Sequence, residues 1–207
     1  MDVVLTPLGP AALRIEVPQS SDAAALAAAL REARIDGISD VSGGESVVVV
    51  YLNSSMVQSE SVQHSVTALL ESTDRFECSP AGEQVVEIPV VYDGADLDAV
   101  AKHCALSVSD VIARHHAAQY RVAFCGFAPG FGYLTGGDQA LAVPRRSRPR
   151  TSVPAGSVGL AGVYSGVYPS EGPGGWQIIG TTNSVLFDAS LPEPSLLRPG
   201  TVVRFVS

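Results

Sequence analysis

Residues 124–182 read FCGFAPGFGYLTGGDQALAVPRRSRPRTSVPAGSVGLAGVYSGVYPSEGPGGWQIIGTT. This segment holds 13 of the chain's 20 glycines and 6 of its 14 prolines, so its backbone is expected to turn often. Short apolar runs typical of β-strands lie here and just outside it: YRVAF (120–124), SVGLAG (157–162), WQIIG (176–180) and TVVRFV (201–206). Short strands separated by Gly and Pro turns predict a closed or nearly closed β-barrel.

The chain just before these strands predicts one more strand and two short helices. We expect the strand over residues 85–92 and the first helix near residues 97–104. The second helix begins after Ser107, where Asp110 can complete a capping box, and runs to about residue 118. The pattern breaks at SPAGEQ (79–84), which predicts a boundary between domains at residues 1–82 and 83–207.

The first predicted domain alternates strand and helix signals. A strand over residues 13–17 precedes an alanine-rich helix that runs from Ser20 or Ser21 to about residue 33, with Gly37 as a stop signal. The β-branched run SVVVVYL (46–52) predicts a strand covered on both faces or in a packed sheet, and a second helix follows at about residues 59–72. The predicted fold is an α+β N-terminal domain followed by a mainly β barrel domain.

Composition limits the partners and the location of the chain. The formal net charge is −8 and the isoelectric point is about 4.9, which argues against nucleic acid as a partner. No apolar run is long enough to predict a membrane span, and the start MDVVLTPLGP lacks a secretory signal. Cys78, Cys104 and Cys125 are far apart and odd in number, so we expect free thiols in a reducing cytoplasm and no metal site.

Residues 124–182 are basic within this acidic chain. They carry more arginines than acids: Arg145, Arg146, Arg148 and Arg150 against Asp138 and Glu171. Prolines restrict the backbone around the arginines, so Arg145, Arg148 and Arg150 are expected at defined points. Guanidinium groups bind carboxylate and phosphate oxygens, which favours a small anionic substrate or an acidic partner surface. The alternative is an ordinary barrel with solvated arginines.

Aromatic residues in the same segment can line a hollow for a ligand, although core packing is the default for any single one: Phe127, Phe131, Tyr133, Tyr168 and Trp176. Ser157 lies between glycines, but the chain has no GxSxG motif, so a turn or hydrogen-bonding role is favoured over a nucleophile. The nucleotide motifs GxxxxGK[ST] and GxGxxG are also absent.

Two adjacent histidines stand near the end of the helix that follows Ser107. Side chains of neighbouring helical residues point about 100° apart, so His115 and His116 are not expected to chelate one metal. One of them can face the barrel while the other faces water. The helix dipole alone favours a histidine at this end of a helix.

Several long strings resemble the B-subunit family of 5-oxoprolinase, also known as allophanate hydrolase subunit 1, which includes the sporulation kinase inhibitor. They are GFAPGFGYL (126–134), PRRSRPRTSVPAGSVG (144–159), SGVYPSEGPGGWQIIG (165–180) and LLRPGTVVRF (196–205). The helix string SVSDVIARHHAAQYRV (107–122) fits as well and places the family's helix histidine at His115. The resemblance is specific over about residues 85–207 and weaker before them. Thr181 stands where many members have arginine, and Arg114 stands where an apolar residue is usual.

The resemblance implies a small α+β domain, a cyclophilin-like barrel and half of a carboxyltransferase-type module. It also implies association with the family's C and A subunits in an enzyme that uses ATP to open the lactam of 5-oxoproline to glutamate. ATP would be bound by the complex, not necessarily by this chain. On this basis we assign His115, Arg145 and Arg150 to catalysis, and assign ligand binding to Phe127, Phe131, Tyr133, Arg148, Ser157, Tyr168 and Trp176.

Two other functions remain open at this point. The barrel domain can bind a sensor histidine kinase as a regulatory inhibitor, which is the second choice. A prolyl isomerase is the third, because a cyclophilin-like fold is a weak guide to chemistry.

Overall fold

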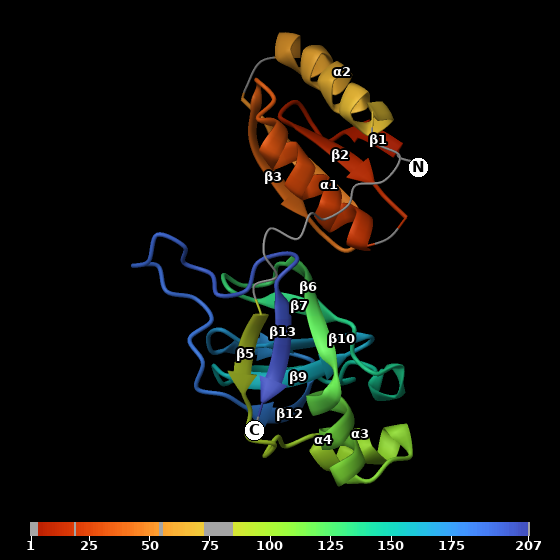
Figure 1. Ribbon diagram of the computed structural model, residues 1–207, viewed down its shortest axis with the longest axis vertical. Helices are drawn as coiled ribbons and strands as arrows, with labels where there is room; N and C mark the ends of the chain where they lie inside the picture. Colours follow the sequence, from red (N-terminus) through yellow and green to blue (C-terminus); the bar gives the residue numbers. More distant parts are fainter. Residues whose placement is uncertain (1–3, 19, 54–55, 73–84, 207) are drawn as a thin grey trace. The chain divides into compact units, whose positions relative to one another are not determined.

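The computed structural model describes residues 4–18, 20–53, 56–72 and 85–206. The chain divides into two compact units, residues 1–80 and 81–207, and Figure 1 draws both. The domain boundary predicted between residues 82 and 83 lies outside the described residues. Each unit is described below by itself.

The first unit is a four-stranded antiparallel sheet with two helices. Its strands follow the order β1-β2-β4-β3 and comprise β1 (Val4–Pro7), β2 (Ala12–Glu16), β3 (Ile38–Gly43) and β4 (Val47–Leu52). The helices are α1 (Ser20–Ala33) and α2 (Met56–Ser72). Buried residues of both helices share one apolar cluster with residues of β2, β3 and β4. The predicted helices are confirmed, whereas β1 and β3 were not predicted.

Strand β4 is buried on alternate residues only. Val48, Val50 and Leu52 are buried, while the residues between them are half-buried or exposed. One face of the strand therefore contributes to the core, as in an antiparallel sheet with helices on one side. Of the two alternatives that the sequence predicts for this run, a strand in a packed sheet is confirmed, whereas a strand covered on both faces is not.

The second unit is built on a seven-stranded sheet with the order β12-β9-β10-β7-β6-β13-β5. These strands are β5 (Val85–Pro89), β6 (Gln119–Cys125), β7 (Gly132–Thr135), β9 (Ser157–Ala161), β10 (Tyr164–Val167), β12 (Gln177–Thr181) and β13 (Val202–Val206). A separate two-stranded sheet joins β8 (Arg150–Val153) to β11 (Gly172–Gly174), and a 3-10 helix, η1, spans Gln139–Leu141. All four apolar runs predicted as strands are therefore strands.

The two edges of the seven-stranded sheet meet at one place. Val91 and Thr181 exchange two backbone hydrogen bonds, of 2.9 and 2.8 Å, so the chain after β5 touches β12 at the opposite edge. A Cβ at Gly180 would lie 2.6 Å from the Val91 carbonyl oxygen, and one at Gly94 would lie 2.3 Å from a backbone atom of Ile179. Glycine at both positions therefore allows the edges to approach.

Two short helices pack against the sheet, and Figure 1 shows them side by side. They are α3 (Leu97–Cys104) and α4 (Val108–Ala117), and both predicted helices are confirmed. Ser107 caps α4 in the expected capping box with Asp110. Leu97, Val100 and Val111 belong to the same buried cluster as the strands, so the helices complete the core of this unit.

Candidate functional site

Within the second unit, a buried carboxylate binds the arginine-rich segment, which comprises residues 144–154. Asp96 precedes α3 and is 3% exposed. Arg150 donates to both of its oxygens at 2.8 and 2.9 Å, and Arg146 donates at 2.5 Å. The backbone amide of Ile178 in β12 donates to the same carboxylate at 2.7 Å. Asp96 therefore ties the arginine-rich segment and β12 to the start of α3.

Two opposing effects act on the pKa of Asp96. Burial raises it, but the hydrogen bonds from Arg150 and Ile178, together with the charges of Arg150 and Arg146, outweigh burial and hold it below its usual value. The carboxylate is thus ionised at neutral pH. Arg150, predicted as a catalytic residue, has its guanidinium group engaged by Asp96, which fits a positioning role better than direct contact with a substrate.

Arg145 and Arg148 are exposed, whereas Arg146 and Arg150, which pair with Asp96, are half-buried. Within the described parts of the chain neither makes a hydrogen bond or an ion pair. The charge of Arg145 lowers the pKa of Tyr168, although burial is the larger effect and raises it. The geometry also places this segment beside Tyr168, because the Arg146 amide donates to the Gly175 carbonyl at 2.7 Å and a Cβ at Gly174 would lie 2.3 Å from the Tyr168 hydroxyl. The Arg145 guanidinium group is exposed and thus available to an anion or a partner.

The predicted aromatic hollow is a packed cluster. Phe131 lies at its centre, with ring centroids of Tyr133, Tyr168 and Trp176 at 5.1, 5.4 and 5.3 Å in edge-to-face contacts. Phe131, Tyr168 and Trp176 are almost fully buried. These rings have the core packing that the sequence favours for any single one, and a role for them in ligand binding stays a prediction. Phe127 is different, because its side chain is 59% exposed.

His115 lies in the core of the second unit and is fully buried. Its Nδ1 lies 2.9 Å from the Tyr92 hydroxyl, and its Nε2 lies 2.9 Å from Oγ of Ser165 in β10. The ring also stacks on Phe205, with centroids 4.4 Å apart. His116 is exposed, as predicted for one of the two adjacent histidines.

The surroundings of His115 keep the ring neutral. Burial, with a smaller contribution from His116, lowers its pKa to about 3. Both ring nitrogens are occupied within the chain, and the Ser165 hydroxyl also reaches the Gly159 carbonyl at 3.4 Å. Because the side chain is inaccessible, the structure favours a role in holding Tyr92 and Ser165 in place. Direct catalysis by His115 stays a prediction.

Ser157 begins β9 and is 2% exposed. Its backbone carbonyl accepts from the Tyr168 amide at 2.9 Å, so the residue ties β9 to the end of β10. This position agrees with the structural role that the sequence favours, and it offers no base next to the hydroxyl among the described residues. A role in ligand binding stays a prediction.

A cleft of about 390 Å³ lies at the seam where the sheet edges meet. Its lining comes from the end of β5 and from the chain around the end of β12: Pro89, Val90, Val91, Thr181, Thr182, Asn183 and Ser184. The Thr181 hydroxyl donates to Asp93 at 2.9 Å. The resemblance places Thr181 where many members of the family are expected to have arginine, and here its neutral hydroxyl lies at the edge of the cleft.

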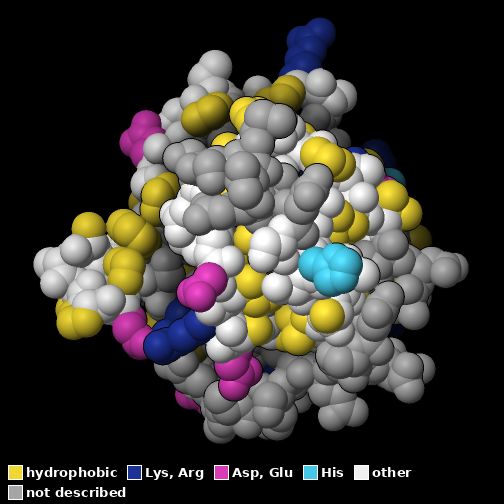
Figure 2. Space-filling view, turned by 90° about the horizontal axis from the view of Figure 1, so that it is seen from above, with side chains coloured by type: hydrophobic (Ala, Val, Ile, Leu, Met, Phe, Trp, Pro, Cys, Tyr) yellow, Lys and Arg dark blue, Asp and Glu magenta, His cyan; other side chains and the backbone are white. Residues whose placement is uncertain are grey.

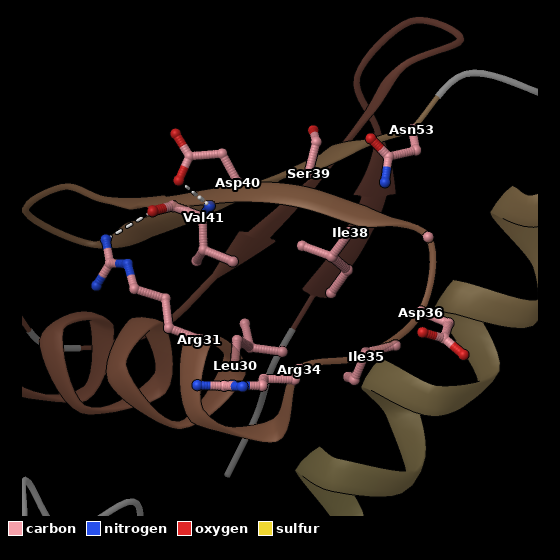
Figure 3. Close-up of a pocket in the computed structure, with 11 residues that line it drawn as sticks. Leu30, Arg31, Arg34, Ile35, Asp36, Ile38, Ser39, Asp40, Val41 and Asn53 are labelled. Atoms are coloured by element: carbon pink, nitrogen blue, oxygen red, sulfur yellow. Dashed lines mark hydrogen bonds between the residues drawn. The ribbon is translucent and has the colours of Figure 1, made fainter.

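A second hollow, of about 370 Å³, lies in the first unit between the end of α1 and β3 (Figure 3). Arg31 donates to the Val41 carbonyl at 2.6 Å, and Asp40 accepts from the Val41 amide at 2.7 Å. Leu30 and Ile38 contribute apolar lining. None of the residues predicted for catalysis or ligand binding belongs to this hollow.

The described residues set two further limits on the site. Among them, no group of three or more His, Cys, Asp or Glu side chains comes together to hold a metal ion. No described helix has the length and apolar character needed to cross a bilayer. On the face drawn in Figure 2, the visible basic side chains form small separate groups among polar and hydrophobic ones.

Asp96, Tyr92 and Ser165 were not predicted as site residues. Asp96 precedes a helix, where an acidic residue is ordinarily taken as an N-cap, although its side chain makes no cap hydrogen bond here. Its arginine partners lie 50 and 54 residues further along the chain. The one sequence signal that could have pointed to Asp96 is the excess of arginines over acids in residues 124–182, since some of those arginines need acidic partners elsewhere in the chain.

Sequence comparison places these features in a family. A sequence model described as "Carboxyltransferase domain, subdomain C and D" matches residues 3–197. The B subunit of 5-oxoprolinase from Escherichia coli O157:H7 is 55% identical over 124 residues, which are 58% of this chain and 57% of that protein. The corresponding protein of Bacillus subtilis (strain 168) is 47% identical over 151 residues, 71% of this chain and 62% of that one. The chain thus spans about three-fifths of the length of these relatives.

Solved structures support the same assignment. The crystal structure of TTHA0988 matches with a TM-score of 0.81 at 35% identity, covering 94% of this chain and 39% of that chain. The urea carboxylase of Kluyveromyces lactis matches with a TM-score of 0.74 at 18% identity, over 99% of this chain and 21% of that chain, which shows a shared fold. Together with the family match over almost the whole length, these likenesses show that the chain belongs to the carboxyltransferase domain family of subdomains C and D.

Proposed function

We propose that this chain is the B subunit of an ATP-dependent 5-oxoprolinase and acts with homologues of the A and C subunits. The observation that carries the proposal is the 55% identity to a 5-oxoprolinase B subunit over 124 residues. The reaction is the hydrolysis of the 5-oxoproline lactam to L-glutamate. A cyclophilin-like barrel and a cytoplasmic location are part of the same proposal.

The reaction requires a way to activate a stable amide. ATP phosphorylates the lactam oxygen and leaves as ADP, which makes the ring carbon a better electrophile. Water then adds to this carbon, the C–N bond breaks to free the amine, and a second water releases phosphate and leaves glutamate. Negative charge is present on the substrate carboxylate and on the phosphoryl group throughout. Arg145 and Arg148 are exposed and make no ion pair in the described chain, so we assign them to binding this charge.

Arg150 and His115, which were predicted as catalytic residues, hold other parts of the site in position. Arg150 and Arg146 fix the arginine-rich segment through Asp96, so Arg145 and Arg148 project from a backbone that is held at both sides. Within that segment the Pro144 carbonyl accepts from Gln177 of β12 at 3.1 Å. His115, neutral and buried, holds Tyr92 and Ser165. These contacts pre-organise a binding surface, which reduces the cost of ordering it when substrate binds.

The described chain leaves this site open. Two hollows were described above, and a third, smaller one lies between Tyr120 and Ser165. Among the described residues, those assigned to catalysis or ligand binding line none of these three. A small anion bound only by exposed arginines would remain in contact with water, where its electrostatic stabilisation is weak. We therefore propose that another subunit closes the site and that the isolated chain is inactive. ATP is bound by the complex.

Reconstitution tests the proposal. The chain is expressed with a homologue of the C subunit, and a homologue of the A subunit, ATP and 5-oxoproline are added. Glutamate is expected from the complete set and not when this chain, either of its partners or ATP is omitted. A correctly assembled set that forms no glutamate would overturn the proposal. The alternative of a kinase inhibitor is not favoured, since the curated relatives are named as enzyme subunits.

A further inference from the structure

Phe127 has an unusual backbone conformation. Its φ is +72°, in the left-handed region that bulky side chains rarely adopt. The amide of Ala128 donates to the carbonyl of Gly126 at 2.9 Å, which closes a three-residue turn around Phe127. A turn of this kind with positive φ at its centre is rare and strained. Glycine would fit this position without strain, yet the chain has phenylalanine.

The surrounding contacts hold the strained turn in place. The Phe131 amide donates to the Ala128 carbonyl at 3.0 Å, and the Gly126 amide donates to the Phe131 carbonyl at 3.2 Å. The Phe127 ring makes edge contacts with Phe131 and Tyr168, at centroid distances of 5.3 and 5.9 Å. The ring nevertheless remains 59% exposed. Strain that is maintained in order to expose an aromatic ring points to a function for that ring.

The charges near Phe127 indicate what it binds. Tyr168 contacts the Phe127 ring, with centroids 5.9 Å apart, and lies against Gly174, next to the Gly175 carbonyl that accepts from the Arg146 amide at 2.7 Å. Arg145 and the nearby Arg148 in the arginine-rich segment are exposed, and the described residues offer them no acidic partner. Phe127 thus combines an exposed aromatic ring with an adjoining segment that carries exposed arginines, and aromatic residues and arginine are enriched at protein interfaces.

We propose that Phe127 is the anchor by which this chain docks onto a partner polypeptide, inserting its ring into an apolar pocket bordered by carboxylates. This inference rests on the proposed function, because it takes the partner to be the homologue of the C subunit. A polypeptide is favoured over a small ligand because the rings beneath Phe127 are packed, so Phe127 projects outward and does not line a cavity. Arg145 then lies at the edge of this contact, where its exposed guanidinium group attracts the carboxylates at the rim of that pocket and also faces the anionic substrate that the partner encloses.

The test measures binding of the full-length chain to the purified C-subunit homologue. Phe127→Ala is expected to raise Kd by about 30-fold or more, as for an interface hot spot. Arg145→Ala is expected to weaken binding by a smaller factor and to reduce its dependence on salt. The matched control is Val163→Ala, which trims a side chain that is 62% exposed in the turn between β9 and β10. The control should bind within about twofold of wild type.

A second measurement tests the turn itself. Phe127→Gly and Phe127→Ala both remove the ring, but only glycine relieves the left-handed backbone. The glycine variant of the isolated chain should therefore melt at a higher temperature than the alanine variant, although both bind the partner weakly. The opposite order of melting temperatures would overturn the strain argument.

The possible failures can be told apart. If wild type binds the C-subunit homologue and Phe127→Ala binds as tightly as Val163→Ala, the anchor is refuted while the proposed function stands. If wild type does not bind at all, the proposed function fails and the anchor fails with it. If wild type forms a homodimer that Phe127→Ala dissociates, the surface is occupied by a second copy, which overturns the commitment to a different polypeptide.

Discussion

Replacing Asp96 with asparagine keeps the shape of the side chain but removes the charge that faces Arg146 and Arg150. Breaking a fully buried ion pair by removing one partner costs about 3–5 kcal/mol. In this cluster the side chain of Asp96 is 4% exposed, while those of Arg146 and Arg150 are 33% and 25% exposed and can regain water. We therefore expect a loss near the lower end of that range, about 3 kcal/mol.

Calorimetry of the full chain at pH 7 measures this loss. For a unit spanning residues 81–207, about 3 kcal/mol lowers Tm by about 10 °C, using an unfolding entropy of about 2.1 cal/mol/K per residue. The matched control is Asp98→Asn, which removes an exposed acid from the first turn of α3 and is expected to shift Tm by about 2 °C or less. If the two variants melt together, the Asp96 cluster does not hold the arginine-rich segment.

The same variant gives a pH test with a defined sign. The folded-state pKa of Asp96 lies below its value in the unfolded chain, so its stabilisation is present above about pH 4 and is lost as pH falls through the folded value. The stability of wild type should therefore approach that of Asp96→Asn in acid. A gap that stays constant down to about pH 2 would contradict the assigned direction of this pKa.

Three further predictions concern the core and the exposed arginines. His115 has a folded pKa of about 3 against 6.5 for the free side chain, so the unfolded chain takes up the proton first. As pH falls from about 6 to about 4, wild type should lose about 1.4 kcal/mol per pH unit, and His115→Gln should lack this slope in denaturant titrations. The Tyr120 hydroxyl is buried without a hydrogen-bond partner among the described residues, whereas the Tyr92 hydroxyl lies 2.9 Å from Nδ1 of His115. Tyr120→Phe should thus leave the free energy of unfolding within about 0.5 kcal/mol of wild type, and Tyr92→Phe should cost about 1 kcal/mol in the same assay. In the reconstituted enzyme, Arg145→Ala and Arg148→Ala should each lower kcat/KM about tenfold or more with Tm unchanged, and wild-type rates in both would show that these arginines are only surface residues.

Local signals in the sequence were sufficient for much of the second unit. Helix α4 could be predicted because its capping box needs only Ser107 and Asp110, three residues apart. Strands β5, β6, β9, β12 and β13 were found because each is an apolar run with turn residues beside it. The short strands β7, β8, β10 and β11 were not predicted. Strand β3, with the sequence ISDVSG, was missed because its exposed residues are polar and only Val41 is fully buried. The composition of β3 is not typical of a strand, and its antiparallel pairing with β4 is what stabilises it as one.

The contacts within the candidate site could not be predicted in the same way. The pairing of Asp96 with Arg150 joins residues 54 positions apart, and no local pattern encodes that distance. The conformation of Phe127 was also unexpected, since phenylalanine carries no signal for a positive φ. The aromatic residues were correctly expected to gather, but whether rings enclose a hollow or fill one another's space depends on packing in three dimensions.

The pairing of charges separates two functions within one basic segment. Asp96 forms ion pairs with Arg146 and Arg150. Outside the arginine-rich segment, Asp138 forms an ion pair with Arg114 of α4. The positive charge of Arg145 and Arg148 remains exposed on this segment, which adjoins Tyr168, and Tyr168 contacts the exposed Phe127 ring. If the barrel were an ordinary one with solvated arginines, two of the four arginines in this segment would not be expected to pair with a buried carboxylate. The buried pairs fix the backbone and thereby set the positions of the exposed ones, so Asp96→Asn should weaken partner binding as well as stability, whereas Arg145→Ala should weaken binding alone.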